Sequence, residues 1–170
     1  MNEVESKVLR PGNLIHISDR EADDFLSFHS MIQGNQRFVT RMKHDRLLAG
    51  DTKEGHQRCK EVLSKLEAIY ERDVPLSKRH PNALSKINRK HAPRENRIAK
   101  LTFSATTLEF KCPEERRNLR TPSIRVNVVQ VREVDPPDGV TPVEWNLVTT
   151  EPIESSGQVA QIVDYYRARR

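Results

Sequence analysis

The sequence predicts a mixed α/β (α+β) fold, in which a strand, an acidic residue and a helix come first and further strands and a final helix follow. An apolar run over residues 13–18 follows a Pro-Gly turn and ends at Asp19. Apolar residues between 20 and 32 then recur at helical spacing before Gly34. Ser155 precedes a second amphipathic segment that continues to the chain end. Helices and strands are therefore expected in one domain.

The segments between these elements favour strands. Residues 36–42 alternate weakly and predict a second strand, whereas an apolar stripe over 56–70 predicts a second, more exposed helix. Further strands are expected over residues 99–104, 106–112, 124–134 and 143–149, which are rich in Val, Ile and Thr. The last two flank a Pro-Pro-Asp-Gly turn and are expected to pair as an antiparallel hairpin.

The charge balance favours a polyanionic partner. The 170 residues include 29 Lys and Arg against 24 Asp and Glu, which gives a formal net charge of +5. Phosphate contacts by Lys and Arg release condensed counterions and so strengthen binding to nucleic acid. Between 75 and 100, eight cations accompany a single acid, Glu95. This segment, from Lys78 to Lys100, predicts a basic arm that contacts phosphates, and a solvated arm without such contacts is the alternative.

Several other classes of protein are disfavoured. Cys59 and Cys112 have no C-x-x-C spacing, and the six histidines have no spacing typical of metal ligands. The sequence has neither an apolar leader nor a run long enough to cross a membrane, so a cytoplasmic protein is expected. Motifs for nucleotide hydrolysis, serine hydrolysis and dinucleotide binding do not occur.

Three stretches, in this order, carry a resemblance to a known family. Residues 19–23 read Asp-Arg-Glu-Ala-Asp and are followed by an Arg-Phe-Val-x-Arg-x-Lys-His pattern over 37–44. Residues 136–145 and 147–155 form the second stretch, and residues 164–169, Asp-Tyr-Tyr-Arg-Ala-Arg, form the third. Together they resemble bacterial DDE transposases of the insertion-sequence-four, cut-and-paste type, as an internal fragment of the catalytic domain.

The resemblance implies a partial RNase H-like catalytic core with an inserted antiparallel β subdomain. The implied divisions are an N-terminal tail over 1–12, the partial core over 13–70, the basic arm and β insertion over 71–153, and the start of the final core helix over 154–170. In this family three carboxylates hold Mg²⁺ (or Mn²⁺) for cleavage and transfer of DNA strands. Asp19 matches the second carboxylate. The first and third are absent from the chain, so it is expected to cleave negligibly by itself.

A simpler role for Asp19 stays open. An Asp between a strand and a helix commonly caps the helix, and here the helix is expected to begin at Arg20. Capping and metal binding do not exclude each other, although the resemblance favours the metal ligand. Asp23, Asp24 and Asp164 fall at helical positions, and we expect them to be solvated acids and not replacement ligands.

DNA contacts are expected at five residues. Arg41 and Lys43 lie at the exit of the second predicted strand and are candidate phosphate contacts. The resemblance implies that Tyr166 and Arg169 lie near the scissile DNA end and that Trp145, the only Trp, stacks on a flipped base. From the residues alone, Trp145 packing in a small sheet and Tyr166 packing on a helix face remain open.

The expected function is therefore DNA transposition, with this chain a truncated version that does not act alone. Its expected partners are transposon ends and a second copy or full-length transposase, in the bacterial cytoplasm and close to the nucleoid. The alternative is a DNA-binding or transposase-interfering regulator without catalysis. A basic protein of unrelated function is the third possibility. Because the implied sheet is incomplete, the strand over 13–18 is expected to keep an open edge and the chain to be marginally stable.

Overall fold

The computed structural model describes residues 14–50, 55–77 and 95–169. Its strands are β1 Ile15–Ser18, β2 Arg37–Arg41, β3 Tyr70–Leu76, β4 Arg97–Lys111, β5 Ser123–Val134 and β6 Glu144–Thr149. Its helices are α2 Phe25–Gln33, α3 Cys59–Ser64 and α4 Ser156–Ala168, with short 3-10 turns η1 Arg20–Ala22 and η3 Glu114–Leu119. The prediction of a mixed α/β fold is confirmed.

All six strands form one sheet with the order β1-β2-β6-β5-β4-β3. β1 and β2 are parallel, and every other pair is antiparallel, including the predicted β5–β6 hairpin. The two strands expected over 99–104 and 106–112 are a single fifteen-residue strand, β4, because it pairs with β5 without a break from Lys100 to Lys111. β6 hydrogen-bonds directly to β2, so the strands expected in an insertion continue the same sheet as β1 and β2.

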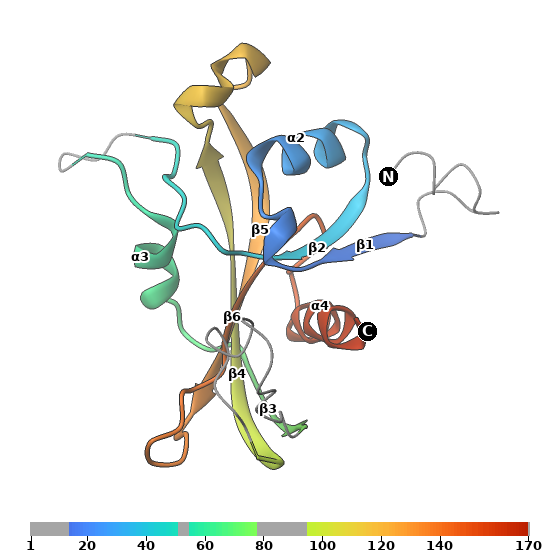
Figure 1. Ribbon diagram of the computed structural model, residues 1–170, viewed down its shortest axis with the longest axis vertical. Helices are drawn as coiled ribbons and strands as arrows, with labels where there is room; N and C mark the ends of the chain where they lie inside the picture. The colour runs from blue at the N-terminus through green and yellow to red at the C-terminus, as the bar shows by residue number, and fades with distance from the viewer. Residues whose placement is uncertain (1–13, 51–54, 78–94, 170) are drawn as a thin grey trace, which may run out of the picture.

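Two hydrophobic clusters lie on opposite faces of this sheet. Neighbouring strand residues alternate between them: Phe38 belongs to one cluster and Val39 to the other, as do Val128 and Val129. Residues of α2 and α3 complete the first cluster, and residues of α4 complete the second. Figure 1 shows α2 and α4 on the two sides of the β1–β2 pair.

Helix α2 begins later than the sequence predicts. Residues 20–22 form only a 3-10 turn, and α2 starts at Phe25. Asp24 has an extended backbone, and its Oδ2 accepts a hydrogen bond from the Ser27 amide at 3.1 Å, so Asp24 is the capping residue. Asp24 also lies 3.6 Å from Arg116. The Asp24 side chain is 43% exposed, so this acid is solvated as expected and in addition caps α2.

The helix expected over 56–70 is also much shorter. α3 covers only Cys59–Ser64, and the chain then turns toward the sheet. The Ile69 amide donates a hydrogen bond to the Phe103 carbonyl at 2.8 Å, and β3 begins at the next residue. Sheet pairing therefore replaces the last helical turns, and Ile69 remains 48% exposed.

Helix α4 agrees closely with its prediction. Ser155 and Gln158 form a reciprocal capping box at its start. The buried side chains of α4 are Val159, Ala160, Ile162, Val163 and Tyr166. Asp164 is exposed to solvent as expected, and Arg72 of β3 donates two hydrogen bonds to its carboxylate at 2.6 and 3.1 Å.

The predicted open edge of β1 is present in the part of the chain that the structure describes, where β1 pairs with β2 alone. All four residues of β1 are half-buried. Ile15 and Ile17 pack against the second hydrophobic cluster, which α4 completes and which we call the α4 cluster. Among the described helices, none combines the length and the apolar composition that crossing a membrane requires.

Candidate functional site at the ends of the parallel strands

The site lies where the two parallel strands end. β1 is followed at once by Asp19, and β2 ends at Arg41. Arg41 lies two residues after Val39, so its side chain belongs to the face of the sheet that α4 covers. The last turn of α4 brings Tyr166 and Arg169 to the same place. The carboxyl ends of parallel strands commonly form binding sites, because the chain leaves the sheet there and side chains converge.

Asp19 is held by the end of α4. Its Oδ1 accepts a hydrogen bond from the Tyr166 hydroxyl at 3.1 Å, and its Oδ2 accepts one from the Arg169 guanidinium at 2.9 Å. The Asp19 side chain makes no capping hydrogen bond to η1. No α-helix begins at Arg20, so Asp19 stands only at the N-cap position of the short 3-10 turn η1, without a side-chain cap. Its two contacts link residues almost 150 positions apart in the sequence.

The same contacts set the charge state of Asp19. Partial burial raises the pKa of its carboxyl, but the neighbouring Arg20 amide and the Arg169 guanidinium together lower it by more, and the pKa lies below its usual value. Burial raises the pKa of the Tyr166 hydroxyl, and the negative charge of Asp19 raises it further, against the lowering effect of Arg41 and Arg169. At neutral pH, Asp19 is therefore an acceptor and Tyr166 a donor.

Aromatic contacts complete the cluster. The Trp145 and Tyr166 rings meet edge to face with centroids 5.6 Å apart, and the Arg169 guanidinium lies 4.7 Å from the centre of the Tyr166 ring. Tyr166 is buried and Trp145 half-buried. The packing interpretation of both residues is confirmed. Stacking of Trp145 on a base stays a prediction.

Arg41 belongs to this cluster, and Lys43 does not. Arg41 donates a hydrogen bond to the Glu144 carbonyl at 3.3 Å. Its positive charge and hydrogen bonding also lower the pKa of the Tyr166 hydroxyl. The Lys43 side chain is exposed, while its amide donates to Asp23. We name the set of Asp19, Arg41, Trp145, Tyr166 and Arg169 the strand-end cluster.

Asp23 is the polar residue that sequence reasoning placed wrongly. It was expected to be solvated, but it is only 4% exposed. Its carboxylate accepts hydrogen bonds from the amides of Lys43 and His44 and from the Arg46 guanidinium. It therefore joins the loop after β1 to the loop after β2. No local pattern marks this role, because its donors come from a segment some twenty residues away.

The Arg46 side chain explains why this acid is buried. Its guanidinium carbon lies over the Phe28 and Phe110 rings, 5.3 and 5.7 Å from their centres, and the Arg46 side chain is only 10% exposed. A buried cation requires an anion beside it. Asp23 supplies that charge and so fixes the two loops that carry Asp19 and Arg41.

The strand-end cluster does not fit a divalent metal by itself. Hard cations such as Mg²⁺ prefer several oxygen ligands, usually with more than one carboxylate. Asp19 is the only carboxylate of the cluster, and both of its oxygens already accept hydrogen bonds. Within the ranges 14–50, 55–77 and 95–169, no group of three potential metal ligands comes together.

The expected basic arm is only partly described. Lys78, Arg79, Lys86, Arg89, Lys90 and Arg94 lie outside the described residues. Arg97 and Lys100 belong to strand β4 and not to the arm. Arg97 makes a bidentate ion pair with Glu133, and the Lys100 ammonium lies 3.4 Å from the Glu71 carboxylate. An intramolecular acid therefore engages the largely buried Arg97, whereas the half-exposed Lys100 stays a predicted phosphate contact.

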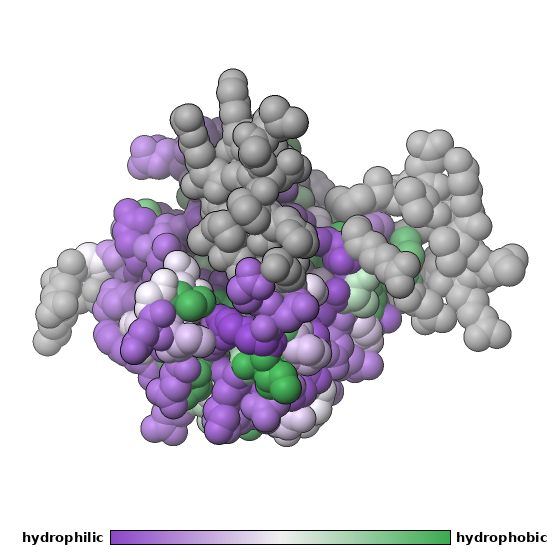
Figure 2. Space-filling view, turned by 60° about the horizontal axis from the view of Figure 1, so that its bottom comes forward, coloured by the Kyte–Doolittle hydropathy of each residue, from purple (hydrophilic) through white to green (hydrophobic). Residues whose placement is uncertain are grey.

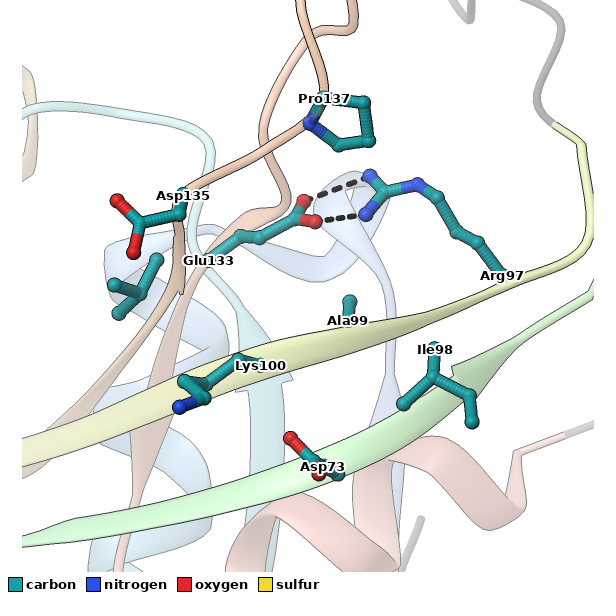
Figure 3. Close-up of a pocket in the computed structure, with 9 residues that line it drawn as sticks. Asp73, Arg97, Ile98, Ala99, Lys100, Glu133, Asp135 and Pro137 are labelled. Carbon is teal, nitrogen blue, oxygen red and sulfur yellow. Dashed lines mark hydrogen bonds and ion pairs between the residues drawn. The ribbon is translucent and has the colours of Figure 1, made fainter.

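A separate pocket lies beside the Arg97–Glu133 ion pair, at the end of the sheet remote from α2. Figure 3 shows the pair beside the pocket. The residues that line it are Asp73, Arg97, Ile98, Ala99, Lys100, Glu133, Val134, Asp135 and Pro137. Its volume of about 270 Å³ lies below the usual range for ligand sites, and its lining mixes acids with bases. In Figure 2, hydrophobic residues on this end of the molecule form only small, separate patches.

The structure thus brings together four of the five expected DNA contacts and the expected metal ligand. They come from four elements, since Asp19 follows β1 and the others lie on β2, β6 and α4 or just after it. A search against models of protein families finds no match for the chain.

Proposed function

We propose that this chain is part of the catalytic domain of a DDE transposase and that its strand-end cluster binds the end of transposon DNA. The observation that carries the proposal is the meeting of Asp19, Arg41, Trp145, Tyr166 and Arg169 at one place. The resemblance selects these residues from separate stretches of the sequence. Packing alone gives no reason for all of them to converge.

The arrangement of the core supports an RNase H-like assignment. In that fold a catalytic acid ends a strand, and here Asp19 ends β1, which is parallel to β2 and connected to it through α2. α4 then covers the opposite face of this pair. Under this proposal the strands β3 to β6 are the β-rich insertion, built here as an extension of the core sheet.

The chemistry of the cluster suits a phosphodiester. Arg41 and Arg169 supply fixed positive charge, and the protonated Tyr166 hydroxyl supplies a neutral donor. Guanidinium groups bind phosphate oxygens through paired N–H donors. The half-buried Trp145 ring lies beside them and presents an apolar surface suitable for a nucleobase.

Cleavage requires more than these residues offer. In the intact enzyme, metal ions would activate the attacking oxygen and stabilise the leaving one, and three carboxylates would hold them. The single, already paired Asp19 favours binding without cleavage. We therefore keep a second candidate, a non-catalytic DNA-binding or transposase-interfering regulator, on the strength of that pairing.

Salt-dependent DNA binding tests the shared part of both candidates. The full chain is mixed with duplex DNA from the element's ends, or with arbitrary duplex, over a series of salt concentrations. The logarithm of affinity is expected to fall linearly with the logarithm of salt, and Arg169→Gln is expected to reduce the slope by about 1. Arg167→Gln is the matched control, because Arg167 lies on the same helix and pairs with Asp164 outside the cluster. Equal slopes for the two variants would contradict the proposal.

Strand cleavage separates the two candidates. With Mg²⁺ and a supercoiled plasmid that carries the element's ends, the chain alone is expected to give no end-specific nicks. Nicking that appears when a second polypeptide supplies the missing carboxylates would favour the split enzyme. DNA binding that inhibits full-length transposase, without nicking in any mixture, would favour the regulator.

A further inference from the structure

We propose that Asp19 acts in the free chain as an internal stand-in for a DNA phosphate, which phosphate must displace before it can bind Tyr166 and Arg169. This inference rests on the proposed DNA-binding function and adds a regulatory contact within the same site. In this role the Asp19 carboxylate does not contact DNA. It weakens DNA binding as long as it accepts hydrogen bonds from Tyr166 and Arg169.

The geometry of the contact supports this role. The two donors best suited to phosphate, the Tyr166 hydroxyl and the Arg169 guanidinium, both donate to the Asp19 carboxylate. Carboxylates and phosphates both present two anionic oxygens, which the paired N–H groups of a guanidinium can bind together. In the free chain both donors are therefore already bound to Asp19, and DNA binding exchanges the carboxylate for a phosphate.

The Arg169 side chain is arranged for such an exchange. Its guanidinium lies over the Tyr166 ring, 4.7 Å from the centre, and this contact does not depend on Asp19. Tyr166 in turn is buried against Trp145 and the α4 cluster. When Asp19 leaves, the ring still holds the guanidinium near its place, so an incoming phosphate finds it already oriented.

The exposure of the pair shows how strong the competition is. The side chains of Arg169 and Asp19 are 33% and 38% exposed, so water screens their attraction. Ion pairs of this exposure contribute little, and removing Asp19 is expected to tighten DNA binding by about twofold to fivefold. The contact is thus a weak latch that DNA can open, and not a permanent block.

Trp145 gives a local optical signal for the test. It is the only Trp in the sequence, and its ring touches Tyr166. The full chain is titrated with a short single-stranded oligonucleotide while Trp145 fluorescence is recorded. Asp19→Asn is the test variant, and Asp19→Ser is a second variant in case the first does not fold, with a thermal melt as the check.

Asp164→Asn is the matched control. It removes the same single negative charge from an acid of α4, which is 50% exposed and pairs with Arg72 instead of the strand-end cluster. Both variants therefore change the net charge equally. Asp19→Asn is expected to bind the oligonucleotide about twofold to fivefold more tightly than Asp164→Asn. Adding Arg169→Gln to Asp19→Asn is expected to remove that difference.

The outcomes distinguish the proposed competition by Asp19 from the proposed DNA binding. If Asp19→Asn and Asp164→Asn bind equally well, or Asp19→Asn binds more weakly, Asp19 is not an internal competitor and the inference is overturned while DNA binding stands. If the oligonucleotide leaves Trp145 fluorescence unchanged in every chain, the cluster does not bind DNA, and both the proposed function and this inference are overturned.

Discussion

At the scale of single residues, the polar contact most sensitive to substitution is the buried ion pair between Asp23 and Arg46. Both side chains are almost completely buried, and Asp23 also accepts the amides of Lys43 and His44. Such a pair contributes little net stability compared with apolar packing, yet losing one partner is costly because the other is left as a bare charge. This contact fixes the loops on both sides of the strand-end cluster.

Asp23→Ala is expected to lower the free energy of unfolding by about 3–5 kcal/mol, because the Arg46 charge stays buried without its anion. Urea denaturation followed by circular dichroism measures the change. The neighbouring Asp24→Ala removes a helix cap and an exposed ion pair with Arg116, and it is expected to cost about 1 kcal/mol because exposed pairs contribute little. Similar losses for the two variants would contradict the central role of Asp23.

The two cysteines are expected to react at very different rates. Burial raises the pKa of the Cys59 thiol to about 12, and this side chain is fully buried with its Sγ 3.9 Å from the Met42 sulfur. Iodoacetamide at pH 8, followed by mass spectrometry of peptides, should modify the half-buried Cys112 first. Cys59 should react only after denaturant is added. Rapid native labelling of Cys59 would show that the α3 region opens.

At the scale of elements, the helix boundaries depend on what each end contacts. α4 begins where its sequence predicts, since its capping box is local and joins Ser155 to Gln158. α2 begins later than predicted, because Asp23 is drawn to the loop after β2 and Asp24 becomes the cap. A local signal therefore gives a reliable boundary only where no distant segment competes for the same side chain.

The capping box gives a prediction at this scale. Ser155→Ala removes the side chain that accepts the Gln158 amide and is expected to cost about 0.5–2 kcal/mol of stability. Ser156→Ala is the matched control, because the cap bonds belong to Ser155 and Ala is the better helix former. Thermal melts of the two variants measure the difference. A larger loss for Ser156→Ala would place the cap one residue later.

At the scale of the whole molecule, the sheet has an unusual edge. β1 is half-buried and parallel to its one partner among the described strands, whereas parallel strands are normally covered on both sides. An open edge presents unpaired backbone groups to other chains. The predicted marginal stability of the isolated chain follows from this edge and awaits a thermal melt.

Self-association through β1 tests this edge. Light scattering of the purified chain is expected to rise with protein concentration, and His16→Lys is expected to reduce it, because a lysine on an edge strand disfavours pairing with another chain. Gln161→Lys adds the same charge on an exposed part of α4 and should leave the scattering unchanged. Equal reductions by both variants would point to net charge and not to the edge.

The sequence by itself determined the parts of this protein that depend on local patterns. Val, Ile and Thr residues favour the strands β5 and β6, the Pro-Pro-Asp-Gly turn between them favours a hairpin, and Ser155 caps α4. The matching stretches also contain the expected site residues Asp19, Arg41, Lys43, Trp145, Tyr166 and Arg169, of which all but Lys43 belong to the strand-end cluster. Periodicity and capping act over a few residues, so they can be recognised without the fold.

Only the tertiary structure decided what these side chains do to one another. It joined Asp19 to Arg169 across the whole chain, buried Asp23 with Arg46, and paired Arg97 and Lys100 with acids of neighbouring strands. It also ended α3 early, because the following residues gain hydrogen bonds in the sheet. Burial and long-range ion pairing depend on which segments meet, and that is set by the packing of the whole sheet.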